Sequence, residues 1–191
     1  YFPIADKKGN TAMQIVTSGP DDEDQTIKMG FLKMISQAKE SIYIQTPYFI
    51  PDESLHEMLK IAVLSGVKVK IMIPSKPDHP FVYRATEYFA KDIVEYGAEV
   101  YMYQNGFLHS KVMVVDDEIV SVGTANMDVR SFKLNFEINA FIYDRDVAEE
   151  LIANFDEDQK NCIRATHDYF AKQSKWRKFK QAFSRLLSPI L

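Results

Sequence analysis

A histidine and a lysine stand two residues apart, at His109 and Lys111, just before the apolar run Val-Met-Val-Val that ends at Asp116. Residues i and i+2 of a β-strand project from the same face, so these two side chains are predicted to point into one site. A phosphate suits such a pair. An imidazole can attack phosphorus or protonate a leaving oxygen, while an ammonium balances negative charge on the other oxygens. The alternative is a strand end that carries a solvated cation.

The position of Asp116 bears on which chemistry is possible. It follows Lys111 by five residues, an odd offset, so it is expected to face the other way or to lie at the strand end. This argues against a His/Asp metal pair and favours a structural partner. The sequence also shows no carboxylate cluster suited to Mg²⁺, and we expect neither a metal nor a cofactor.

Three further residues are candidates for the same site. Asn126 follows a Gly-Thr turn, where its amide could bind phosphate or orient a catalytic group, unless it only makes local turn bonds. Glu137 lies in an apolar strand, where an unpaired carboxylate is costly, so we expect a cation or N–H partner, a catalytic imidazole first. The alternative is that Glu137 is a surface carboxylate on an edge strand. Tyr48 follows a strand end and lines either a pocket or the core. The remaining histidines are interpreted as surface or packing residues: His56, His79 and His167.

Strands and helices are predicted to alternate along the chain. This order favours an α/β fold with a mixed, largely parallel β-sheet flanked by helices on both faces. In such sheets ligands collect at strand ends, where His109 is expected. Cys162, the single cysteine, is expected to pack in a helix. Strands are predicted at 13–17, 41–46, 67–73, 99–103, 118–122 and 137–143 and in the run after His109, and helices at 24–38, 51–66, 80–96 and from 144.

The 191 residues are 46% hydrophobic and 13% aromatic, enough for one core with an appendage. We expect a domain over 1–171 and a basic amphipathic tail over 172–191. The tail has six Lys and Arg and no acid, so with a net charge of -4 the first 171 residues carry -4 - 6 = -10. This balance favours an anionic membrane surface as a partner and disfavours nucleic acid. The tail either lies on that surface or docks on protein.

The longer pattern H-x-K-x4-D-x6-G-[ST]-x-N, which runs from His109 to Asn126, resembles the HKD motif of the phospholipase D superfamily. The segments YIQTPYFIPDESL, GFLHSKVMVVDD, GTANMDVRSF and LNFEINAFIYD together resemble the C-terminal half of bacterial cardiolipin synthases. Such enzymes carry two HKD motifs and an N-terminal membrane segment. This chain has one motif and no spanning segment, so the resemblance implies a partner: the N-terminal HKD half of the same enzyme, or a second copy.

The resemblance also implies an activity. Two phosphatidylglycerol molecules would give cardiolipin and glycerol at a bacterial cell membrane, on its cytoplasmic side or peripherally, through a phosphohistidine shared by two motifs. It assigns His109, Lys111 and Asp116 as the catalytic set, with Thr124, Asn126 and Glu137 in support and Tyr48 beside them. Two alternatives remain: a homodimeric HKD phosphodiesterase or nuclease, and a non-catalytic membrane-associated half-domain.

Overall fold

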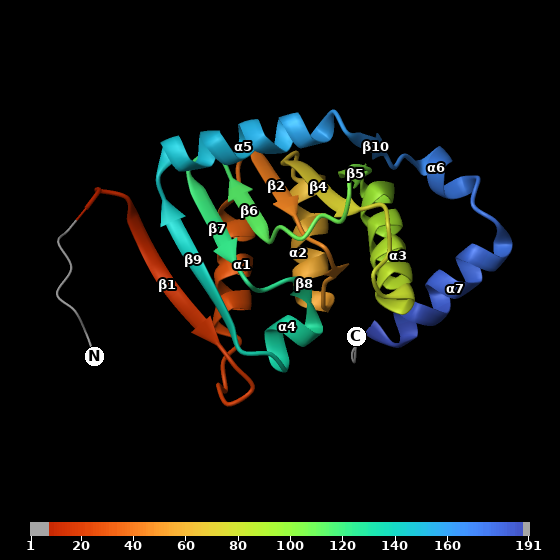
Figure 1. Ribbon diagram of the computed structural model, residues 1–191, viewed down its shortest axis with the longest axis horizontal. Helices are drawn as coiled ribbons and strands as arrows, with labels where there is room; N and C mark the ends of the chain where they lie inside the picture. The colour runs from red at the N-terminus through yellow and green to blue at the C-terminus, as the bar shows by residue number, and fades with distance from the viewer. Residues whose placement is uncertain (1–7, 189–191) are drawn as a thin grey trace.

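The computed structural model describes residues 8–188, so the ends of the expected domain and tail, 1–7 and 189–191, lie outside the described residues. An eight-stranded sheet forms its centre, with helices on both sides (Figure 1). The strands are β1 Ala12–Ser18, β2 Ser41–Gln45, β3 Phe49–Ile50, β4 Lys68–Pro74, β5 Glu99–Tyr103, β6 Val112–Val115, β7 Ile119–Gly123, β8 Met127–Asp128, β9 Glu137–Tyr143 and β10 Cys162–Arg164. The helices are α1 Thr26–Gln37, α2 Glu53–Leu64, α3 Pro80–Tyr96, α4 Val129–Lys133, α5 Arg145–Gln159, α6 His167–Ala171 and α7 Lys175–Leu186.

The sheet is mixed, as predicted, but its parallel part is smaller than predicted. Its order is β1-β9-β7-β6-β2-β4-β5-β10, and only β2, β4 and β5 pair in parallel. The other neighbours are antiparallel, because β6 and β7 form a tight hairpin and β9, β1 and β10 run against their partners. β3 and β8 form a separate parallel pair.

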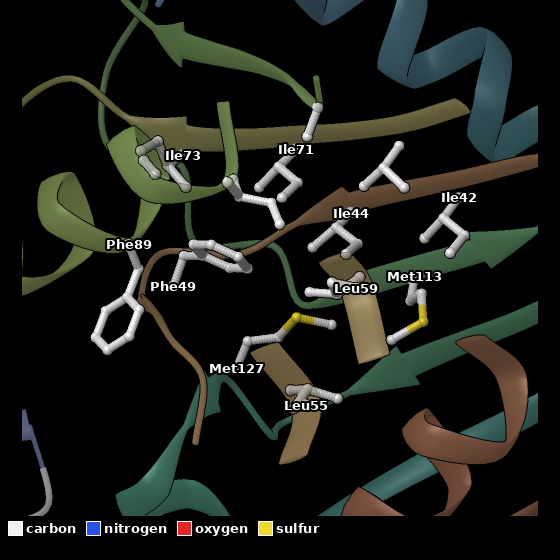
Figure 2. Close-up of a cluster of buried hydrophobic side chains, with 14 of the residues drawn as sticks. Ile42, Ile44, Phe49, Leu55, Leu59, Ile71, Ile73, Phe89, Met113 and Met127 are labelled. Atoms are coloured by element: carbon white, nitrogen blue, oxygen red, sulfur yellow. The ribbon is translucent and has the colours of Figure 1, made fainter. Parts of the chain in front are cut away.

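The main core lies on the face covered by α1, α2 and α3. Figure 2 shows isoleucines of β2 and β4 packed against Leu55 and Leu59 of α2, with Phe49 and Met127 beside them. On the other face, α5 covers a smaller apolar layer that includes Val114, Val120 and Ala148. The sheet is therefore buried on both faces over its central strands, which holds the strand ends in fixed positions.

The helix boundaries follow local sequence signals. The Asp52 carboxylate accepts from the backbone N–H of Leu55 at the start of α2, and the Asp144 carboxylate accepts from the N–H of Val147 at the start of α5. Gly97 ends α3 with a φ of 114°, a conformation that glycine adopts without steric cost. The predicted bounds of α3, β5 and β9 are confirmed.

The prediction for Cys162 is wrong. Helix α5 ends at Gln159, and Cys162 begins the edge strand β10, which runs antiparallel to β5. The chain turns at Lys160 and Asn161, where the carbonyl of Asn161 accepts from the N–H of Gln104. The short elements β3, β8, α4 and α6 have no counterpart in the sequence-based prediction, because each is only two to five residues long.

Candidate active site at one edge of the sheet

The strand registers bring six of the seven predicted site residues to one edge of the sheet. Gln45 at the end of β2 faces Val112 at the start of β6, Val112 faces Val122, and Gly123 faces Asn139. The end of β2, the start of β6, the end of β7 and the start of β9 therefore lie together, at the lower edge in Figure 1. These residues follow or precede those strands: Tyr48, His109, Lys111, Thr124, Asn126 and Glu137.

His109 and Lys111 lie in the segment that leads into β6, not in the strand as predicted. The pairing with β2 stops at Val112, because β2 is followed by Thr46 and Pro47, and proline offers no N–H to a ladder. The His109 ring is exposed beside the Phe107 ring, with centroids 5.9 Å apart. The Lys111 Nζ donates to the His109 carbonyl oxygen at 2.9 Å. Lys111 thus contacts His109, but it does so at the backbone carbonyl and not at the imidazole ring.

Lys111 sits in a partly desolvated, acidic surrounding. Burial lowers the pKa of its ammonium, while the negative charges of Glu137 and Asp128 act in the opposite direction. Burial also raises the pKa of Asp128, against hydrogen bonds from Ser131 and Asn126 that lower it. A half-buried ammonium attracts an anion more strongly than a solvated one, because the local dielectric constant is lower.

Thr124 and Asn126 occupy the loop that follows β7. The Thr124 hydroxyl accepts from the N–H of Ile138 at 2.9 Å, so this side chain secures the loop to β9. A Cβ on Gly123 would stand 2.2 Å from the Ile138 carbonyl oxygen, which explains the glycine. The buried Asn126 Oδ1 has no hydrogen-bond partner among the described residues. Such an acceptor is costly when unpaired and suits a donor such as a substrate hydroxyl.

Glu137 has an N–H partner, as expected, but the donor is not an imidazole. Its Oε1 accepts from the Asn135 side-chain amide at 3.0 Å, and the hydrogen bonds of the described residues include none between Glu137 and His109. The negative charge of Glu137 nevertheless opposes the effect of burial on the Lys111 pKa.

Tyr48 lines a pocket of about 530 Å³ at this edge. Its hydroxyl donates to the Asp78 carboxylate, and burial, with Asp78, raises the Tyr48 pKa. His79, interpreted from sequence as a surface or packing residue, is exposed and lines the same pocket. Of the other two histidines, His167 is exposed. His56 is buried, and its Nε2 lies 2.7 Å from Oδ2 of Asp92. The remaining lining residues are Pro80, Phe81, Val82, Asn126, Asp128, Arg130 and Asn135.

Several residues that support this site were not singled out from the sequence. The Asn139 Oδ1 accepts from the N–H of Ala125, the Ser131 Oγ accepts from the N–H of Asn126, and Thr46 Oγ1 accepts from the N–H of Met127. Arg130 and Asn135 reach the pocket itself. The available signal was the block RSF-x-LNFE, whose polar residues come directly after the Asn126 loop.

Asp116 lies at the opposite edge of the sheet. Its carboxylate accepts from three backbone N–H groups, those of Lys39 and Glu40 at 2.8 Å and that of Ser41 at 2.9 Å. Asp116 and Asp117 have φ angles of 52° and 55°, the two central positions of a type I′ turn between β6 and β7. Asp116 lies seven positions after His109, at most roughly 23 Å away at about 3.3 Å per residue. The side chain therefore fastens the hairpin to the start of β2.

Comparison with known proteins decides the family. Residues 31–159, more than half of the chain, match the family described as "Cardiolipin synthase, PLD-like domain". The chain belongs to this family. It is 59% identical, over all 191 residues, to the cardiolipin synthase of Listeria monocytogenes serotype 4a (strain HCC23), and 58% identical to the major cardiolipin synthase of Bacillus subtilis (strain 168). It spans 40% of the length of each of these relatives.

Solved structures share the fold of this chain. Nuc from Salmonella typhimurium, a phospholipase D family member, matches with a TM-score of 0.69 at 21% identity, over 82% of this chain and 99% of that one. The phosphatidylserine synthase of Haemophilus influenzae Rd KW20 matches with a TM-score of 0.73 at 18% identity, over 95% of this chain and 48% of that one. The fold unit therefore occurs both as nearly a whole chain and as half of a longer one.

Proposed function

We propose that this chain is one half of a phosphatidyltransferase that joins two phosphatidylglycerol molecules into cardiolipin and releases glycerol. The observation that carries the proposal is a half-buried Lys111 beside an exposed His109 at one sheet edge, in a chain 59% identical to cardiolipin synthases over its full length. The bacterial cell membrane is the proposed location. No helix within residues 8–188 is both long and apolar enough to cross a bilayer.

His109 is proposed as the acid and base of the transfer. An imidazole from the other half attacks phosphorus, so an N–P bond forms and the bond to the glycerol oxygen breaks. Protonated His109 gives its proton to that leaving oxygen, then takes the proton of the acceptor hydroxyl, whose oxygen displaces the imidazole from phosphorus. Lys111 balances charge on the non-bridging oxygens. One histidine cannot fill both roles, because the acid and the nucleophile act on opposite sides of phosphorus.

Asn126, Glu137, Thr124 and Tyr48 are proposed to support that reaction. The unpaired Asn126 Oδ1 suits a glycerol hydroxyl of either substrate, which a phosphate alone could not satisfy, because phosphate oxygens are acceptors. Glu137 contributes negative charge near Lys111, and Thr124 keeps the loop against β9.

Within the described residues, no group of three or more His, Cys, Asp or Glu side chains is arranged to hold a metal ion.

An exposed apolar strip beside the site is the proposed contact with the second half. Leu134, Phe136 and Ile138 are 57%, 75% and 46% exposed, and they flank Glu137. Apolar side chains grouped in this way are typical of protein interfaces. The partner is the N-terminal HKD half of the same enzyme or a second copy of this chain, since either would bring a second imidazole to the edge.

The test is a reconstitution. This chain, the complementary part of the Listeria monocytogenes enzyme, and both together are incubated with phosphatidylglycerol vesicles, and cardiolipin and glycerol are measured. We expect equal amounts of both products, and only from the mixture. Cleavage of DNA by a dimer of this chain, without cardiolipin, would instead support a nuclease. No product from a mixture shown to associate would contradict the proposed transferase.

A further inference from the structure

Helix α7 docks on the domain through its polar side. Helix α7 lies beside α3 (Figure 1). Arg177, Gln181 and Ser184 are spaced at helical intervals along one side of α7, and Gln181 and Ser184 are buried. Arg177 and Gln181 both bind Glu87 of α3, whose side chain is fully buried and also pairs with Arg84. This ion-pair network sets the rotation of α7 about its own axis.

The apolar side of α7 consequently remains largely exposed and borders a groove at the start of α3. Trp176, Phe179, Phe183 and Leu186 are 63%, 59%, 48% and 72% exposed. The Trp176 and Phe179 rings stack, with centroids 5.5 Å apart and planes at 10°. A soluble helix normally buries such a stripe and exposes its polar side. A contiguous exposed aromatic face marks a contact with another apolar phase.

The groove beside this face adjoins the pocket that contains Tyr48. A groove of about 330 Å³ lies between the start of α3 and α7, lined by Pro80, Phe81, Trp176, Phe179 and Phe183 together with Arg84, Lys180 and Ser184. Pro80 and Phe81 also line the pocket that contains Tyr48, Asn126 and Arg130. Phe81 is 55% exposed and forms the wall shared by groove and pocket.

The charges around this face identify its occupant. Residues 172–188 contain six Lys and Arg and no acid. Among the ion pairs between described residues, only that of Arg177 joins these cations to a carboxylate of the domain. Lys180 lies over the Trp176 ring at 5.2 Å, at the border between the aromatic face and solvent. Aromatic side chains bordered by Lys and Arg fit the headgroup region of an anionic lipid leaflet, where the rings contact acyl chains and the cations contact phosphates.

We propose that the outer face of α7 and the groove at Phe81 receive the acyl chains of an anionic phospholipid, with the headgroup directed past Phe81 into the Tyr48 pocket. The proposal rests on the phosphatidyltransferase function proposed above. It adds the route by which the lipid reaches the site and the surface that meets the membrane. The rigid docking of α7 by Glu87 keeps the route aligned with the pocket.

Trp176 is the only tryptophan of the chain, so its fluorescence reports on this surface directly. With vesicles of phosphatidylglycerol, we expect Trp176 emission to shift to shorter wavelength and to be quenched by brominated acyl chains. Phosphatidylcholine vesicles should give a much smaller effect. The double variant Phe179→Ser/Phe183→Ser should bind phosphatidylglycerol vesicles at least about tenfold more weakly, or about 1.4 kcal/mol. The matched control Ile61→Ser/Leu64→Ser, on the exposed side of α2, should bind normally.

Moving the tryptophan tests the route to the pocket. In a Trp176→Phe background, Phe81→Trp should show the same shift and quenching, and Ile61→Trp should show neither. An unchanged Phe81→Trp signal would overturn the route, and unchanged Trp176 emission would overturn the surface. Concentration-dependent self-association that shifts Trp176 emission without lipid would also overturn it, in favour of a second copy. None of these signals requires turnover, so a failure of the proposed catalysis is distinguishable from a failure of the route.

Discussion

At the scale of single residues, His109 and Asp116 stand near the two ends of β6 in different environments. The imidazole is exposed at the edge that carries the pocket, whereas the carboxylate accepts three backbone N–H groups at the other edge. The odd offset from Lys111 predicted that Asp116 faces the other way or lies at the strand end, although the resemblance assigned Asp116 to the catalytic set with His109 and Lys111. The sequence could not predict that Lys111 contacts the His109 carbonyl, since this depends on where the β2 pairing ends.

His109→Ala in the two-half enzyme should lower cardiolipin formation by about 10² to 10⁴, the usual contribution of a general acid–base. The fold should be intact, because the side chain is exposed. The measurement is initial-rate formation of cardiolipin from phosphatidylglycerol, with circular dichroism and thermal melting on the same samples. His167→Ala is the matched control, an exposed histidine away from the site. Near-normal turnover of His109→Ala would show that the site has been misplaced.

Asp116→Asn should act on stability instead. An amide cannot accept from three N–H groups as a carboxylate does, and charge-assisted hydrogen bonds are the stronger ones. We expect the free energy of unfolding in urea to fall by about 3 kcal/mol. Asp117→Asn, at the neighbouring turn position, should change it little, because asparagine tolerates positive φ. A normal stability with abolished turnover would contradict a structural role for Asp116.

At the scale of helices and strands, the predictable parts are those with long periodic patterns. The bounds of α3 follow from Pro80 at its start, Gly97 at its end and an apolar stripe between them. The dominance of antiparallel pairing departs from the predicted alternation, because β6 and β7 follow each other without a helix and pair antiparallel. The orientation of α7 could not be predicted from the sequence. Amphipathic spacing shows that the helix has a polar and an apolar side, but not that the polar side binds the buried Glu87.

Arg177→Ala should loosen α7 from the domain. It removes a partner from Glu87, which remains fully buried, and removing one partner of a buried ion pair costs about 3 kcal/mol. We expect lower stability in urea and faster proteolysis within residues 172–188. Lys175→Ala, an exposed cation on the same helix, should change neither. If both variants are cleaved at the rate of the unaltered chain, the Glu87 contacts do not hold α7.

The contact between α2 and α3 should depend on pH. Burial lowers the pKa of His56 below its ordinary value of 6.5, while the bond to Asp92 opposes this; Glu57 and Lys60 are the other charged neighbours. A depressed pKa means that the folded state favours the neutral ring. The stabilisation is therefore complete above pH 6.5 and is lost as the pH falls toward the folded pKa.

Between about pH 7.5 and 5.5, the free energy of unfolding should fall less in His56→Gln than in the unaltered chain, because glutamine does not titrate. The measurement is urea unfolding at a series of pH values. His79→Gln, at an exposed histidine, serves as the control and should keep the original slope. An unchanged slope in His56→Gln would show that other groups govern this range.

At the scale of the whole molecule, the site is open at one sheet edge and holds one HKD histidine, whereas the proposed transfer needs two imidazoles. Similar units occur as nearly the whole of the Nuc chain and as about half of the Haemophilus phosphatidylserine synthase chain, so the same fold is found both nearly alone and within a longer chain. The acidic body, with -10 over residues 1–171, disfavours a polyanionic nucleic acid near the same edge. The basic α7 is the part that can approach an anionic membrane.

This chain should consequently be inactive as a monomer. His56 is buried against Asp92, and neither His79 nor His167 has a lysine two residues later, so none of them can replace the missing imidazole. Adding the complementary half should restore cardiolipin formation, and Phe136→Ser should weaken that restoration, because it removes the most exposed apolar side chain beside Glu137. Ile61→Ser, on α2, should complement normally. The measurement is cardiolipin formation at concentrations where analytical ultracentrifugation shows the oligomeric state. Robust cardiolipin formation by a preparation that remains monomeric would refute the two-imidazole requirement itself, whereas activity that appears only with dimerisation would identify a second copy as the partner.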